Sequence, residues 1–249
     1  FLSRTGVYGI VSSTITAERT LQNRSYYIDA QLTKEKDLQN AVAVQWQGFY
    51  LIAMNGRCYI LDGKQDKSYK PQSNGDYVYE CYHWENIPAV CFLEYAGDLF
   101  FGTSDGRICR FNTDIETMSR YNDDGQAIPC YWATVADCDG AIGVYKTMTK
   151  RGNTVTIKPY TRSSARITAR TEHDAGKQLR YDTMDILDWN DIDFNRFTFN
   201  TLDSPQTIAF NAKVKRYKTL QLIIGNDAVN EGFGLYRIEK SYTVGNYVK

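Results

Sequence analysis

The chain has 249 residues, enough for one large all-β domain or two ordinary domains with a sizeable core. Its 29 Lys and Arg balance its 29 Asp and Glu, so no net field attracts nucleic acid or anionic lipid, and we expect no specific nucleic-acid partner. No apolar run approaches the roughly 18 residues of a transmembrane helix, which predicts no membrane span. Aromatic residues make up 14% of the chain, and this enrichment favours strands.

The chain begins with FLSRTGVYGI, which lacks the charged start and apolar middle of a signal peptide. Because Phe1 is not an initiator Met, we interpret the chain as a fragment or processed product that earlier sequence precedes. One short early stretch, QLTKEKDLQNA over 31–41, has a helical pattern. In GFYLIAMNGRCYILDGKQ, over 48–65, Asn55-Gly56 joins two apolar runs and predicts a two-residue hairpin turn.

A second hairpin of the same kind, GDLFFGTSDGRICRFNTD, follows about 50 residues later over 97–114. A repeat of about 40–50 residues built only of strands is typical of β-propeller blades, although hairpins are common enough for the match to be coincidental. At a shift of 50 the matching positions are Asn55 and Asp105, Gly56 and Gly106, with Gly6 one step earlier; the apolar runs 41–46 and 88–95 match after a one-residue adjustment.

The repeat fails at its next step, which lands on Thr156. Two and a half blades cannot close a ring, because propellers usually need about 4–8. Either earlier blades precede Phe1 or later segments complete the ring in diverged form. We therefore expect an all-β fold with propeller-like blades over 1–125, N-terminally truncated, and a second domain over 126–249.

The second half contains seven or eight short stretches with strand character, several of which alternate apolar and polar residues. Such a series without helical patches predicts a β-sandwich-like domain. The stretches are 130–137, 144–150, 153–161, 165–172, 197–201, 206–214, 218–226 and 235–244.

The cysteines and histidines form no recognisable site. His83 lies beside Cys81, but a Cys-x-His pair without partners does not hold a metal, and His173 has no nucleophile signature near it. With no P-loop or dinucleotide fingerprint, we expect no catalytic residue, no cofactor and no metal. We expect reduced, buried thiols, with some disulfide pairing as the alternative, for Cys58, Cys81, Cys91, Cys109, Cys130 and Cys138.

Acidic residues gather in YDTMDILDWNDIDF, over 181–194. Their oxygens suit Ca²⁺, and two of them would suit a glycosidase acid/base pair, but the calcium-loop spacing is absent. We favour a solvated loop or short helix that links two strands. The residues are Asp182, Asp185, Asp188, Asp191 and Asp193.

A basic series follows the first expected strands of the second half. Even spacing would place the last three arginines of the series on one face of a strand, and such a face could bind phosphate. The favoured interpretation is a solvated face or a polar contact to a neighbouring protein. Tyrosine clusters at 24–29 and 76–84 suit binding platforms or core positions equally. The basic residues are Lys146, Lys150, Arg151, Lys158, Arg162, Arg166 and Arg170.

Three long stretches carry a resemblance. RSYYIDAQLTKEKDLQNAVAVQWQGFYLIAMNGRCYILDGKQ, CYWATVADCDGAIGVYKTMTKRG and the final YKTLQLIIGNDAVNEGFGLYRIEKSYTVGNYVK resemble a family of bacteriophage and prophage structural proteins from Gram-positive hosts. The resemblance implies a propeller followed by a β-rich C-terminal region, in a virion protein of the tail or head–tail connection assembled in the host cytoplasm. It also implies a homo-oligomer with other tail or connector proteins as partners, a natural C-terminus at TVGNYVK, and no active site.

Three functions follow as hypotheses. The favoured one is a non-enzymatic tail structural protein that acts through assembly. The second is a module that binds a host-surface glycan or protein, motivated by the aromatic-rich stretch 66–86. The third is a glycan depolymerase, motivated only by the acidic cluster from Asp182 to Asp193.

Overall fold

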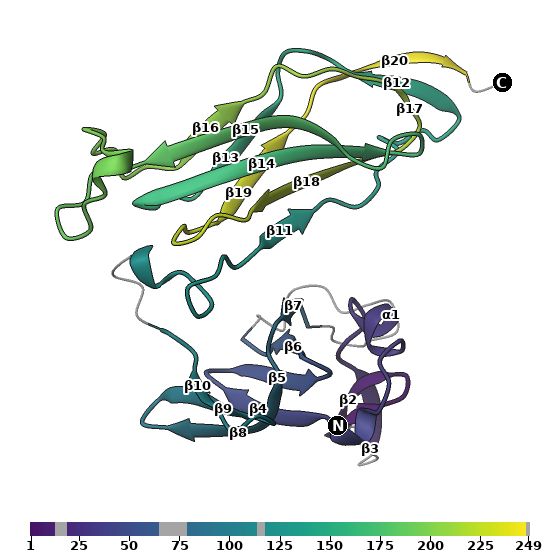
Figure 1. Ribbon diagram of the computed structural model, residues 1–249. Helices are drawn as coiled ribbons and strands as arrows, with labels where there is room; N and C mark the ends of the chain where they lie inside the picture. The colour runs from purple at the N-terminus through teal and green to yellow at the C-terminus, as the bar shows by residue number, and fades with distance from the viewer. Residues whose placement is uncertain (13–18, 65–78, 114–117, 248–249) are drawn as a thin grey trace. The chain divides into compact units, whose positions relative to one another are not determined.

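The computed structural model describes residues 1–12, 19–64, 79–113 and 118–247. It confirms the all-β prediction: strands make up 50% of the chain and helices 5%, and the strands form several antiparallel sheets. The chain divides into two compact units, Phe1–Thr113 (unit 1) and Asp114–Lys249 (unit 2) (Figure 1). No helix in the described part of the chain is long and apolar enough to cross a membrane.

The described residues of unit 1 form three antiparallel sheets, each built from strands that are consecutive in the chain. The first sheet comprises β1 (Leu2–Ser3), β2 (Gly6–Ser12) and β3 (Arg19–Asn23). The middle sheet comprises β4 (Val42–Trp46), β5 (Phe49–Met54), β6 (Arg57–Asp62) and β7 (Cys81–Glu85). The third sheet comprises β8 (Ala89–Tyr95), β9 (Asp98–Thr103) and β10 (Ile108–Arg110).

The central strands of the middle sheet, β5 and β6, are buried on both faces. Successive side chains of a strand point to opposite faces, so an unbroken apolar run such as that of β5 fills two cores. One face packs on the third sheet through Trp46, Leu51, Ala53, Cys58 and Ile60, which meet Ala89, Leu99 and Phe101. The other face packs on Val7 and on Ile28 and Leu32 through Ile52, Met54, Tyr59 and Leu61.

The two expected hairpins differ in their turns. Asn55-Gly56 is the predicted two-residue turn, with φ angles of 53° and 76° between paired Met54 and Arg57. At Asp105-Gly106 the prediction of a two-residue turn is wrong. There the loop is longer, because Gly102 pairs with Ile108 and the Arg107 carbonyl accepts from the Thr103 amide at 3.0 Å.

Gly6 is not the counterpart of Gly56. It opens β2 directly after the β1–β2 turn, with φ 142°, whereas Gly56 lies between β5 and β6. The substitution of a larger residue at Gly6 would bring a Cβ to 2.3 Å from Asp29 Oδ1, so close packing explains this glycine instead of a repeated turn. The third step, Thr156, lies in a strand of unit 2.

The helix expected over 31–41 is wrong in its middle. The structure has α1 (Asp29–Leu32) and a 3₁₀ turn, η1 (Leu38–Asn40), separated by Asp37 with a left-handed φ of 56°. Glu35, in the connection, holds the Asn55-Gly56 hairpin. Its carboxylate accepts from Asn55 Nδ2 at 2.8 Å, Arg57 NH1 at 2.9 Å and the hydroxyl of buried Tyr59 at 2.7 Å.

We expect Glu35→Gln to lower the free energy of unfolding by about 1–3 kcal/mol near neutral pH, because these donors lose a charged acceptor. Burial opposes ionisation, but the hydrogen bonds from Asn55, Tyr59 and Arg57 hold the pKa of Glu35 below its ordinary 4.5. A depressed pKa contributes stability above the ordinary value that is lost as pH falls through the folded-state pKa. In urea denaturation, the difference in the free energy of unfolding between wild type and Glu35→Gln should shrink below about pH 4.5. A difference that stays constant into strong acid would contradict this assignment.

Unit 2 begins earlier than the expected boundary between 125 and 126. The segment after 117 is bonded into unit 2: the amide of Met118 donates to Asp191 at 3.0 Å and Asn122 Nδ2 donates to Asn230 Oδ1 at 2.8 Å. The loop composition that suggested the boundary does not report these long-range bonds. The 3₁₀ turn η2 (Met118–Arg120) starts this segment.

One four-stranded and two three-stranded sheets make up unit 2. The first contains β11 (Cys130–Ala133), β18 (Leu220–Asn226), β14 (Arg162–Thr171) and β15 (Lys177–Asp185) in that order. The others are β17 (Val214–Tyr217), β12 (Val144–Met148), β20 (Tyr242–Tyr247), and β16 (Gln206–Ala209), β13 (Thr154–Ile157), β19 (Leu235–Glu239).

A single core joins these sheets. It takes Ala165, Ile167 and Ala169 from β14 and Leu220, Leu222 and Ile224 from β18, which meet apolar residues of β12, β13, β16 and β17. Most predicted strands are present, but 197–201 forms none, and β15 was missed because its acidic residues suggested a loop. Both errors lie at the candidate site: β15 forms its first part, and 197–201 belongs to the connection that follows.

All six cysteines are free thiols. Burial raises the pKa of the Cys58 and Cys81 thiols to about 12 each, as expected of unreactive core cysteines. The expectation of full burial holds for Cys58 only: Cys91 is exposed on the third sheet, and the other four thiols are half-buried.

Candidate functional site

The acidic stretch lies at one end of unit 2, in β15 and the connection 186–205 that leads to β16. Asp182 and Asp185 belong to the strand, and the other three aspartates to the connection, which also contains the 3₁₀ turn η3 (Phe194–Arg196). In Figure 1 this connection, in green, extends beyond the ends of β15 and β16. The expected loop is therefore present for the second half of the stretch only.

Arg162, at the start of β14, holds the connection through two carboxylates. It forms ion pairs with Asp191 and, at 3.3 Å, with Asp193, and its side chain is largely buried. Asp193 also caps η3 by accepting from the amide of Asn195 at 2.9 Å. That backbone hydrogen bond, with the charge of Arg162, lowers the pKa of Asp193. Asp191 and Asp193 therefore hold the connection against Arg162.

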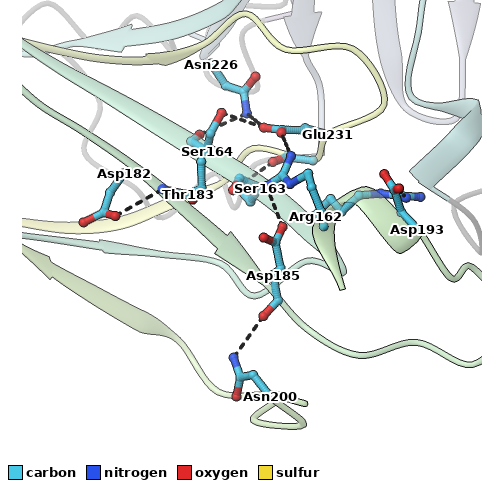
Figure 2. Close-up of polar contacts among 12 residues, drawn as sticks. Arg162, Ser163, Ser164, Asp182, Thr183, Asp185, Asp193, Asn200, Asn226 and Glu231 are labelled. Carbon is cyan, nitrogen blue, oxygen red and sulfur yellow. Dashed lines mark hydrogen bonds and ion pairs between the residues drawn. The ribbon is translucent and has the colours of Figure 1, made fainter. Parts of the chain in front are cut away.

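Arg196, in η3, forms the second anchor. It pairs with Glu231 and, at 2.5 Å, with Asp185. Glu231 is 3% exposed in its side chain, and its other oxygen accepts from Ser164 Oγ at 2.6 Å and Asn226 Nδ2 at 2.9 Å (Figure 2). Burial opposes the charge of Arg196, but Glu231 and Asp185 raise its pKa overall. A buried carboxylate with three donors is a strong constraint on the position of η3.

The network leaves little free space between its side chains. Within the described residues, no three His, Cys, Asp or Glu side chains are placed to hold a metal ion. The hollow between Arg162, Asp191 and Arg196 has a volume of about 20 Å³, which is room for about one water molecule, whereas ligand pockets usually measure about 300–1,000 Å³. The network positions the connection; it offers no space for a sugar ring.

The connection exposes a group of aromatic side chains next to its anchors. Phe197 stacks on Phe194 with ring centroids 6.4 Å apart and meets the Phe199 ring edge-on at 5.0 Å. Phe194 is 86% exposed and Phe199 is 83% exposed. We call Phe194, Phe197 and Phe199 the phenylalanine cluster. Rings that contact each other in water form an apolar surface of the kind that marks interaction sites.

The basic series does not form one phosphate-binding face. Arg162, Arg166 and Arg170 do lie on the outward side of β14, alternating with its core residues. Arg166 is paired bidentately with Asp227 at 2.7 and 3.0 Å, and Arg170 Nε donates to the carbonyl of Ala175 at 2.9 Å. Lys146 is fully buried, where its ammonium donates to the carbonyls of Cys138, Ala141 and Lys218, while Lys150, Arg151 and Lys158 are exposed.

Neither histidine makes a contact that belongs to the network. His83 packs its ring on Tyr59, with centroids 5.0 Å apart, and Cys81 donates weakly to the Tyr79 carbonyl, so the pair shares no ligand position. His173 is exposed beside Glu172.

The tyrosine clusters are mixed in character. Tyr26 and Tyr27 are exposed, and Tyr82 and Trp84 are part-exposed on β7, whereas Tyr79 is partly buried against a core of unit 1. Of the aromatic-rich stretch 66–86, residues 66–78 lie outside the part that the structure describes.

Sequence reasoning missed Arg196, Glu231 and the phenylalanine cluster. The pattern FTFNT predicts a strand, because alternating aromatics usually fill one sheet face. The available signal was the excess of aromatics within an acidic, otherwise polar segment, which is unusual for a solvated loop. Comparison with protein-family models and with curated proteins matches nothing to this chain, so no family is assigned to it.

Proposed function

We propose that the protein is a non-enzymatic structural component of a bacteriophage virion, in the tail or the head–tail connection, and that it acts through assembly. The observation that carries the proposal is the phenylalanine cluster on a connection fixed by Arg162 and Arg196. An apolar surface that is already ordered loses little conformational entropy on binding. The quoted sequence stretches, which resemble phage structural proteins, supply the choice of a virion.

At the level of architecture, we propose that the sheets of unit 1 are propeller-like blades and that unit 2 is a β-sandwich. In support of blades, consecutive meanders pack face to face in chain order, and the middle one has a core on each side of its central strands β5 and β6. In support of a sandwich, one core lies between the four-stranded sheet and the three-stranded sheets.

The partner that fits the phenylalanine cluster is a neighbouring virion protein, or another copy of this chain, with an apolar pocket. Buried aromatic anchors dominate the binding energy of such interfaces. Exposed rings would also stack on sugars, so binding to a host-surface glycan or receptor is the alternative function, and an experiment can separate the two.

We expect Phe194→Ser combined with Phe199→Ser to reduce incorporation into particles at least about tenfold, the loss expected of interface anchors. Phage particles assembled with the variant would be purified and quantified by immunoblot. Tyr236→Ser, which removes an exposed aromatic from β19, is the matched control and should leave incorporation unchanged. Normal incorporation of the phenylalanine variant would contradict the proposal. Normal incorporation with lost binding to host cell walls would favour the alternative.

A further inference from the structure

The third sheet of unit 1 presents an exposed copy of the face that the middle sheet buries. The correspondence follows from two matching turns. Gln47-Gly48, with φ angles of 48° and 84°, joins paired Trp46 and Phe49, and Ala96-Gly97, with 53° and 89°, joins paired Tyr95 and Asp98. These type I′-like turns align β4–β5 with β8–β9, one residue out of step with the alignment of Gly56 on Gly106.

In this alignment, a residue of the middle sheet and its counterpart in the third sheet point in the same direction along the stack. Ile52 faces the first sheet, and its counterpart Phe101 faces the middle sheet. Leu51 faces the third sheet, and its counterpart Phe100 points away from the middle sheet, because Phe101 beside it points in. We call the side of Leu51 and Phe100 the forward face. In the middle sheet the third sheet covers it, and Trp46 Nε1 reaches across to the Gly97 carbonyl at 2.9 Å.

The forward face of the third sheet exposes several apolar side chains, beside an ion pair between Arg110 and Asp98 at 3.1 Å on the same face. Leu93 corresponds to part-buried Val44, Tyr95 to buried Trp46, and Ile108 to buried Cys58. Their exposed fractions are 63%, 71% and 82%. Cys91, also exposed, corresponds to Val42. These side chains thus suit a face that packs on another sheet, yet within the described residues no further sheet covers them.

The first sheet presents the complementary surface. Val7 points into the core shared with the middle sheet, so Tyr8 and Ile10 on the same strand alternate toward the opposite, outward side. Leu21 pairs directly with Ile10, and both are exposed. Within the described residues, unit 1 is therefore a stack that exposes apolar side chains on the forward face at one end and on the outward face at the other.

We propose that the forward face of β8–β10 binds the outward face of β2–β3 in a second copy of this chain. The stack itself indicates this partner. Within it, the forward face of the middle sheet is covered by the apolar face of the third sheet that points back toward it. The contact is head-to-tail, so it generates rings or open chains instead of a two-fold dimer. It involves unit 1 and is independent of the phenylalanine cluster.

The test uses the full chain in two blocked forms, Leu93→Asp with Ile108→Asp on the forward face and Ile10→Asp with Leu21→Asp on the outward face. Sedimentation velocity should show wild type growing with concentration into species larger than dimers and each blocked form remaining monomeric. An equimolar mixture of the blocked forms should give one-to-one dimers and nothing larger. Val135→Asp, at an exposed position of unit 2, is the matched control and should associate as wild type does.

A second measurement needs no variant. Alkylation of the Cys91 thiol in wild type should slow at least about tenfold between dilute and associated protein, because the thiol lies on the proposed contact. Monomers at every concentration would overturn the proposal, as would an unchanged Cys91 rate in associated protein. Two-fold dimers that only the forward-face variant abolishes would overturn the head-to-tail occupant.

Discussion

Arg196→Met is expected to lower the free energy of unfolding by about 3 kcal/mol. The substitution leaves Glu231, whose side chain is 3% exposed, as a buried carboxylate without its cation, and it also removes the partner of Asp185. Breaking a buried pair by removing one member costs about 3–5 kcal/mol, and the partial exposure of Arg196 places the effect at the lower end. Urea denaturation followed by circular dichroism measures it.

The matched control is Arg180→Met, in which an arginine on neighbouring β15 loses Asp182 at 2.8 Å. Both members of this pair are exposed, so we expect a loss of less than about 1 kcal/mol. The double variant Arg196→Met, Glu231→Gln should be more stable than Arg196→Met alone, since the uncompensated charge is gone. Equal losses for Arg196→Met and Arg180→Met would show that the network does not fix the connection.

Leu51→Ala should lower the free energy of unfolding by about 2–5 kcal/mol, the range for a truncated core leucine. Leu51 is 1% exposed between the middle and third sheets, where it packs among Trp46, Cys58 and Ile60 of its own sheet and residues of the next. Calorimetry should show a lower melting temperature for the transition of unit 1.

Leu93→Ala provides the same chemical change on the exposed forward face of the third sheet. In dilute, monomeric protein it should change the free energy of unfolding by less than about 0.5 kcal/mol. A large loss at Leu93 under those conditions would mean that the face is already covered within one chain, and it would contradict the exposed face on which the head-to-tail contact depends.

Local turn chemistry could be predicted from the sequence where it was self-contained. Asn55-Gly56 forms the expected turn because Asn and Gly both accept positive φ. Asp105-Gly106 has the same signal, but Thr103 accepts from the amide of Arg107 through its hydroxyl at 3.0 Å and the loop widens by this contact. A match in residue type therefore hid a difference of one residue in register.

The candidate site could be predicted only in part, because its contacts join distant segments. The sequence indicated a cluster of aspartates and an arginine series, and the structure brings Arg162 to Asp191 and Asp193. Nothing in a single sequence pairs Arg196 with Glu231, since tertiary packing alone brings η3 to the loop after β18. The helix expected over 31–41 failed for a related reason: the contacts of Glu35 with the hairpin compete with helix formation.

The most direct test of the proposed function is immunogold electron microscopy of purified phage particles with antibodies against this chain. A virion component predicts gold at one fixed position on the particles, at the tail or its junction with the head. Labelling confined to host debris, with none on intact particles, would contradict the account.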